Sequence, residues 1–147
     1  DNPAFIGEYA KRDIEQCWSE YLCSIAQMAQ TGFFQIVGHL DLLKLFGHTM
    51  PDSQIPYLNR ALESIADNHL AIELNAAGWR KPIKECYPSA FILEKAFQKG
   101  IDITFGSDAH SVEHIGFRYN DLCALAKSVG YTHALYFSEK QPIKVVF

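Results

Sequence analysis

Residues 101–110 read IDITFGSDAH, a short apolar segment that ends at a glycine and continues directly into the polar side chains of Asp108 and His110. A run rich in β-branched and aromatic residues, bounded by glycine and serine, predicts a buried strand over residues 101–105. Polar residues directly beyond a buried strand are typical of folds in which the strand ends carry the chemistry.

Predicted strands and helices alternate along the rest of the chain. Further strands are predicted over residues 33–37 (FFQIV), 71–74 (AIEL) and 134–137 (ALYF), with a last extended segment over 143–147. Apolar residues recur at helical spacing between these strands, in segments 14–29, 56–65, 89–99 and 120–129. Strands separated by helices indicate parallel β/α units and not a sandwich or a helical bundle.

The length limits how much of a barrel these units can build. A complete (β/α)₈ barrel needs about 250 residues, so 147 residues are enough for roughly half of one. We therefore expect an α/β fold of about four parallel β/α units, which form part of a single domain over residues 1–147. Ligands should bind beyond the carboxyl ends of the strands.

Composition excludes several classes of partner. Thirteen Lys and Arg against seventeen Asp and Glu give a net charge of −4, which argues against nucleic acid, because a phosphate backbone demands a basic surface. No apolar run approaches the roughly 20 residues that cross a bilayer, so we expect neither a membrane span nor a signal peptide. The four cysteines form no Cys-x-x-Cys pair, so we expect buried free thiols in a reducing cytoplasm.

Polar side chains follow three of the predicted strands. They are His39 and Asp41, Glu73 and Asn75, and Asp108 and His110. Each pair alone has an ordinary explanation: a lone histidine is often structural, Asp108 can cap a helix, and Glu73 can be a solvated carboxylate. Together at equivalent strand ends, imidazoles and carboxylates are the ligands of hydrolytic Zn, Mn or Fe centres. The adjacent cations Arg80 and Lys81 suit an anionic substrate, although surface charge explains them equally well.

These motifs together resemble the polymerase-and-histidinol-phosphatase (PHP) family, in its histidinol-phosphatase branch. GHLD at residues 38–41 resembles the family's GHxD motif, and SDAH at 107–110 resembles its SDAH motif. Residues 73–88 resemble its E-x-N…G-x-RKP…YP segment, and 130–137 its closing strand. The resemblance covers nearly the whole chain from about Ile14.

The resemblance implies a distorted TIM-like barrel that hydrolyses a phosphomonoester with two or three divalent metal ions, Zn, Mn or Fe. By position His39, Asp108 and His110 match metal ligands, and Arg80 matches a basic residue that holds the substrate phosphate. We assign Arg80 and Asn75 to substrate binding, and Asp108 and His110 as catalytic residues. Either Asp108 or His110 could assist proton transfer, and the sequence does not decide between them. The ions would activate water for attack on phosphorus.

One departure from the family is large. Its opening His-x-His motif and the other ligands of its first half have no counterpart here, and the first residue is Asp1. We therefore expect the chain to be the C-terminal portion of such an enzyme, with little activity alone and with open sheet edges that self-associate. Another phosphoesterase of the same superfamily, or a non-catalytic remnant that binds partners, remains an alternative. A His-x-His-rich segment upstream of Asp1 would argue against the non-catalytic remnant and for the enzyme.

Overall fold

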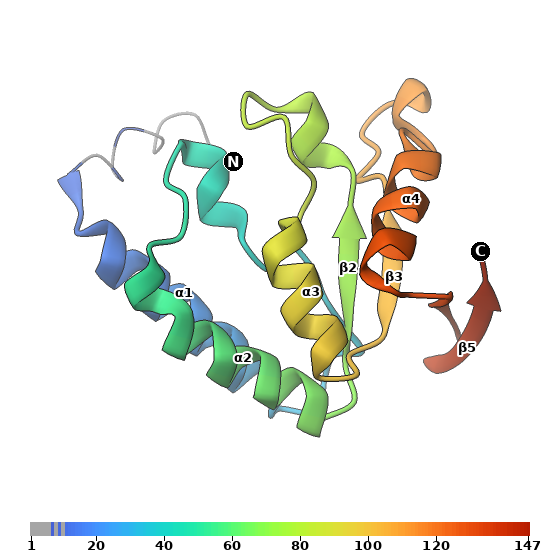
Figure 1. Cartoon of the computed structure of the whole chain (residues 1–147), viewed down its shortest axis with the longest axis horizontal. Coiled ribbons are helices and arrows are strands. Elements are labelled where there is room, and N and C mark those ends of the chain that lie inside the picture. Colours follow the sequence, from blue (N-terminus) through green and yellow to red (C-terminus); the bar gives the residue numbers. More distant parts are fainter. Residues whose placement is uncertain (1–6, 8, 10) are drawn as a thin grey trace.

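The computed structural model describes residues 7, 9 and 11–147, along which helices and strands alternate (Figure 1). The helices are α1 (Ile14–Ala29), α2 (Ile55–Asp67), α3 (Ala90–Gln98) and α4 (Tyr119–Val129). The strands are β1 (Ile36–Val37), β2 (Ala71–Asn75), β3 (Ile103–Gly106), β4 (His133–Ser138) and β5 (Gln141–Val146). Short 3₁₀ helices lie in the loops: η2 (Leu42–Phe46), η3 (Asp52–Gln54), η4 (Ala77–Arg80) and η5 (Val112–His114).

Strands β1, β2 and β3 form a parallel sheet in that order. Ile36 pairs with Ala71, and Asn75 at the end of β2 pairs with Gly106 at the end of β3. The chain therefore leaves all three strands at the same edge of the sheet. Ile72 and Leu74 of β2 are fully buried in the hydrophobic core. In Figure 1, α3 lies to the left of β2 and α4 overlaps the upper part of β3.

Helices α1 and α2 pack side by side (Figure 1). The carboxylate of Asp13 caps α1 by accepting the backbone N–H groups of Glu15 and Gln16 at 2.9 and 3.2 Å, which satisfies donors that a helix start otherwise leaves free. The hydroxyl of Ser64 in α2 donates to the Ala26 carbonyl of α1 at 2.8 Å. This buried hydrogen bond fixes the register of the two helices.

The expectation of about four parallel units is wrong at the fourth strand. In the described residues β4 pairs antiparallel with β5, as a separate two-stranded sheet. Glu139 and Lys140 form the connecting turn, with φ values of 49° and 65°. Two consecutive positive φ values are the geometry of a type I′ turn, which matches the twist of a hairpin. The chain therefore turns back at Ser138 instead of continuing a parallel sheet, and three parallel strands remain.

The predicted strand over residues 33–37 is also too long. Only Ile36–Val37 is a strand, while Phe33 and Phe34 are 80% and 51% exposed. Gly32 has a φ of 71°, and the Thr31 hydroxyl accepts the N–H of Phe33 at 3.3 Å. The end of α1 thus continues as a turn through Phe33, which delays the strand.

Two other sequence expectations concern the membrane and the cysteines. No helix among residues 7, 9 and 11–147 combines the length and apolarity needed to cross a bilayer. All four cysteines are free: Cys17 and Cys86 are buried, whereas Cys23 and Cys123 are only half-buried. The expectation of buried thiols therefore holds for two of them.

Candidate active site

His39 and Asp108 meet at the carboxyl edge of the parallel sheet. His39 follows β1 and Asp108 follows β3, so the two strands that carry them lie on either side of β2. The Nε2 atom of His39 is 3.5 Å from Oδ2 of Asp108, and about a third of each side chain is exposed, 32% and 31%. The sheet therefore brings an imidazole and a carboxylate together at a solvent-accessible point.

The backbone at both residues is strained and held in place. His39 and Asp108 have φ values of 49° and 50°, in the left-handed region that non-glycine residues rarely occupy. The His39 carbonyl accepts hydrogen bonds from the Tyr21 hydroxyl and from the N–H of Leu42. The Asp108 carbonyl accepts one from Nη2 of Arg80 at 2.8 Å. Strain that neighbouring contacts enforce in this way clusters at functional sites.

Glu73 points into the same region from the central strand. An added Cβ at Gly106 would lie 2.1 Å from Oε1 of Glu73, and one at Gly38 would lie 3.3 Å from Oε2. The glycines that end the flanking strands therefore leave the space that the Glu73 carboxylate fills. Glu73 was expected at a strand end but was not predicted as a metal ligand or a catalytic residue. Gly38 and Gly106, each directly beyond an apolar segment, were the signal that could have identified it.

Asn75 is fully buried, and both the NH₂ group and the carbonyl oxygen of its side chain make hydrogen bonds. Its Nδ2 donates to Oε2 of Glu73 at 2.9 Å, and its Oδ1 accepts the N–H of Ala77 at 2.7 Å. Nδ2 also lies 3.5 Å from Nε2 of His39. This geometry favours a role in orienting Glu73, and substrate binding by Asn75 stays a prediction.

Arg80 reaches the site from η4. Its Nη2 donates to the Asp108 carbonyl, and its guanidinium lies over the Phe117 ring at 5.2 Å. Its Nη1 is buried and makes no hydrogen bond within the described residues. A guanidinium held in a fixed orientation by a carbonyl and an aromatic ring is a charged group that suits an oxyanion.

His110 lies at the outer rim. Its side chain is 78% exposed, and its Nδ1 lies 3.8 Å from Oδ1 of Asp108 and 2.9 Å from the Asp108 carbonyl oxygen. Asp108 is thus the residue that both histidines approach, one on each side.

Asp41, which the sequence grouped with His39, turns away from this site. Its carboxylate is 2% exposed, pairs with Lys44 at 2.8 Å and accepts the N–H of Ser89 at 2.8 Å. Burial raises the pKa of Asp41, while the Lys44 charge opposes the shift. The ring of Tyr87 lies 5.4 Å from the His39 ring and 5.1 Å from Nζ of Lys44, between the two groups. Burial raises the pKa of Tyr87 to about 12, so its hydroxyl is neutral at physiological pH.

The donor set fits a divalent metal ion in part. Two ligands of a tetrahedral zinc ion at its usual bond lengths lie about 3.3 Å apart, close to the 3.5 Å between His39 Nε2 and Asp108 Oδ2. Imidazole nitrogen and carboxylate oxygen are both zinc ligands. Within the described part of the chain, however, no group of three or more His, Cys, Asp or Glu side chains is arranged to hold an ion.

Comparison with known proteins identifies relatives. No family model matches the chain. A Deinococcus radiodurans protein named as a histidinol-phosphatase is 41% identical over 130 residues, which cover 88% of this chain and 49% of that protein. The chain spans about half the length of the curated relatives it matches.

Two crystal structures share the fold. A Listeria monocytogenes protein described as a histidinol phosphatase matches with a TM-score of 0.65 and 27% identity, over 74% of this chain and 44% of that one. The histidinol phosphate phosphatase of Lactococcus lactis, in complex with zinc, L-histidinol and phosphate, matches with a TM-score of 0.69 and 21% identity. That match covers 92% of this chain and 54% of the other. The three-stranded parallel sheet is consistent with the TIM-like fold that the sequence resemblance implies, and the described residues do not show a closed barrel.

Proposed function

The chain belongs to the PHP family, in its histidinol-phosphatase branch, and from this premise we propose that it supplies part of the active site of a metal-dependent phosphomonoesterase. The observation that carries the proposal is the convergence of His39, Asp108 and Arg80 at the carboxyl edge of the parallel sheet. Ligands of parallel β/α folds bind at this edge.

We propose L-histidinol phosphate as the substrate, which places the reaction in histidine biosynthesis. The Lactococcus lactis relative binds L-histidinol and phosphate, the two parts of this ester. In this chain the guanidinium of Arg80 is the group that would contact the phosphate, and its hydrogen bond to the Asp108 carbonyl holds it at the site. A charged hydrogen bond from a guanidinium that is already held in place orients the phosphoryl group before reaction.

His39, Asp108 and His110 are the residues that would hold divalent ions, with Glu73 as an additional carboxylate beside them. Zn, Mn or Fe, two or three ions in the intact enzyme, would supply Lewis acidity and a water activated at neutral pH. Asp108 and His110 lie within 3.8 Å of each other through Oδ1 and Nδ1, and we assign them the transfer of protons at the reacting oxygens. Arg80 would balance the charge on the phosphoryl oxygens.

We propose further that residues 1–147 form one portion of a single catalytic domain, and that the ligands needed to close each metal site come from outside the described residues. Two observations support this. No group of three His, Cys, Asp or Glu ligands is assembled in the described part of the chain, and the chain spans about half the length of its relatives. The isolated chain should therefore show little turnover.

A chimera tests the proposal directly. This chain would replace the matching segment of the Deinococcus radiodurans relative, with which it shares 41% identity. We expect the folded chimera to hydrolyse L-histidinol phosphate when zinc or manganese is added, and to prefer it to p-nitrophenyl phosphate and to nucleotides.

The control variants use residues of matching backbone. His39 and His69 both have left-handed φ values, 49° and 56°, and asparagine tolerates that region. His39→Asn and Asp108→Asn should abolish turnover, whereas His69→Asn should not. A folded His39→Asn chimera with full activity would refute the assignment, and a preference for nucleotides would favour a different phosphoesterase of the superfamily.

A further inference from the structure

Two arginines beside the candidate site each lie over an aromatic ring of the other's segment. The guanidinium of Arg80 is 5.2 Å from the centre of the Phe117 ring, and that of Arg118 is 4.1 Å from the centre of the Trp79 ring. Both distances are within the roughly 6 Å over which an aromatic face attracts a cation. Trp79 and Arg80 are consecutive in η4, and Phe117 and Arg118 are consecutive just before α4. Each segment therefore gives one cation and one ring to the other, and we refer to these two contacts as the two stacks.

The segment before α4 is held in shape independently of η4. Gly116 and Arg118 have φ values of 68° and 50°, so the chain bends sharply on both sides of Phe117. Nε of Arg118 donates to Oδ2 of Asp121 in the first turn of α4 at 2.7 Å. The guanidinium of Arg118 is therefore fixed at its edge by a carboxylate, while its face lies on the ring of Trp79.

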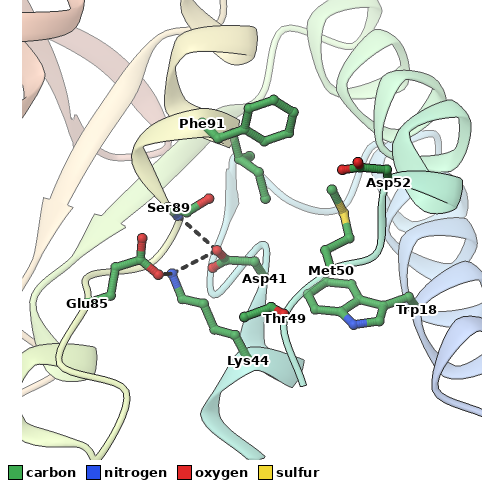
Figure 2. A pocket seen from close by; sticks show the side chains of 10 residues that line it. Trp18, Asp41, Lys44, Thr49, Met50, Asp52, Glu85, Ser89 and Phe91 are labelled. Atoms are coloured by element: carbon green, nitrogen blue, oxygen red, sulfur yellow. Dashed lines mark hydrogen bonds and ion pairs between the residues drawn. The ribbon is translucent and has the colours of Figure 1, made fainter. Parts of the chain in front are cut away.

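The chain that follows η4 supports it as well. An added Cβ at Gly78 would overlap the carbonyl oxygen of Glu85, so the backbone at Glu85 lies directly against η4. The Glu85 carboxylate is paired in turn with Nζ of the buried Lys44 at 2.8 Å, a contact that Figure 2 shows. The two stacks and this packed segment together leave η4 little freedom to move.

Arg80 is the residue through which this arrangement reaches the candidate site. Its Nη2 donates to the Asp108 carbonyl at 2.8 Å. A long side chain loses rotamer freedom when it binds a ligand, and one that is already held in place avoids most of that cost. We propose that the two stacks hold the Arg80 guanidinium in the orientation in which it meets the substrate phosphate. Trp79, Phe117 and Arg118 are then positioning residues, and this inference rests on the phosphate-binding role proposed above for Arg80.

NMR of the arginine side chains tests this on the whole chain, without metal or substrate. The chain has four arginines, Arg12, Arg60, Arg80 and Arg118. With ¹⁵N-labelled arginine, the Nε–H signal that is missing from Arg80→Lys is the signal of Arg80. We expect a rigid Arg80 side chain in the heteronuclear NOE and slow exchange of its Nε proton with water, whereas the exposed Arg60 should be mobile. An Arg80 side chain as mobile as that of Arg60 would overturn the proposal.

Paired variants show whether the two stacks are the cause. Phe117→Leu should raise proton exchange at Arg80 about two- to fivefold, the loss expected for one cation–π contact, while Phe117→Tyr keeps an aromatic face and should not. Arg118→Asn suits the left-handed backbone and should also raise exchange at Arg80, although Arg118 stacks on Trp79. Arg118→Lys keeps a cation over that ring and should preserve the parent value. Unchanged exchange at Arg80 in either folded Phe117→Leu or folded Arg118→Asn would overturn the proposal.

A double-mutant cycle in the chimera separates positioning from a general weakening of the fold. Phe117→Leu should lower kcat/KM for L-histidinol phosphate about two- to fivefold, and it should have no further effect in the Arg80→Ala background, because the ring acts through the guanidinium. An equal loss in both backgrounds, or no loss where Arg80 is present, would contradict positioning. If Arg80→Ala itself leaves the kinetics unchanged, the phosphate-binding role of Arg80 fails, and the NMR comparison still decides whether the two stacks hold its side chain.

Discussion

Nε2 of His39 lies 3.5 Å from Oδ2 of Asp108, although the strands that carry them are separated by the whole width of β2. Parallel pairing brings the two strand ends to one edge of the sheet, and both residues have a left-handed backbone. We expect this pair to bind zinc weakly in the isolated chain, because two ligands give only part of a coordination shell. His39→Asn and Asp108→Asn should each lower zinc affinity by at least about tenfold.

Equilibrium dialysis with zinc measures this without any turnover. His69→Asn is the control, since it removes an imidazole at a similar backbone position outside the site. An equal loss of zinc in all three variants would mean that binding is nonspecific.

The close approach of Glu73 to Gly106 and Gly38 predicts how alanine at each glycine affects stability. Gly106→Ala places a Cβ 2.1 Å from Oε1 of Glu73, and overlap of this kind costs about 1–3 kcal/mol in the free energy of unfolding. Gly38→Ala, where the distance is 3.3 Å, should cost less. Urea denaturation of both variants gives the comparison.

A double variant separates this overlap from backbone effects. Adding Glu73→Ala to Gly106→Ala removes the side chain that the new Cβ meets, so the double variant should lose less stability than the sum of the single variants. Strict additivity would show that the glycine is needed for another reason.

Arg80 gives a kinetic prediction in the chimera. Arg80→Ala should lower kcat/KM for L-histidinol phosphate. The loss should correspond to about 1–3 kcal/mol of transition-state stabilisation, the value of a hydrogen bond to a charged group. Arg60→Ala is the control, because it removes the same charge from the exposed face of α2. It should leave kcat and KM unchanged. If the two variants behave alike, Arg80 is a surface cation.

The sequence predicted the positions of these residues better than their surroundings. The order of strand, glycine and polar cluster predicted that His39 and Asp108 lie at one edge of the sheet, and the structure brings them within 3.5 Å. The period of a strand and the parallel topology determine where strand ends meet, whereas the roles of these residues stay a prediction. Asp41 was grouped with His39 because it is two residues away, but its side chain pairs with Lys44. That pairing depends on Glu85 and Cys86, about forty residues later in the chain, and no local pattern reveals it.

The hairpin could not be predicted for a similar reason. The turn at Glu139 and Lys140 lacks the Asn-Gly or Asp-Gly pair that normally identifies a type I′ turn. What supports the hairpin is tertiary: Asp102, just before β3, lies 3.0 Å from Nε2 of His133 and 3.6 Å from Nζ of Lys144. One carboxylate therefore contacts both strands of the hairpin.

Burial of Cys86 predicts a loss of stability in alkali. Burial raises the pKa of its thiol from about 9 to about 11. The folded state thus keeps this proton where the unfolded state releases it, so stability falls as pH rises from about 9 and continues to fall up to about 11. The full loss is about 2–3 kcal/mol for a shift of this size. Urea denaturation of Cys86→Ala at intervals from pH 8 to 11 should show a shallower decline than the parent chain, and an identical slope would assign the decline to other groups.

The last prediction concerns association. β1 and β3 are the end strands of the parallel sheet, and Phe33 and Phe34, just before β1, are 80% and 51% exposed. An apolar patch beside an end strand is a site at which chains pair, so we expect concentration-dependent dimers in sedimentation velocity. Phe33→Asp should shift the chain toward monomer without loss of stability, because its side chain contributes little to the core. Tyr57→Asp, at an exposed aromatic of α2, should leave association unchanged. A parent chain that stays monodisperse and monomeric at high concentration would show that this edge does not associate.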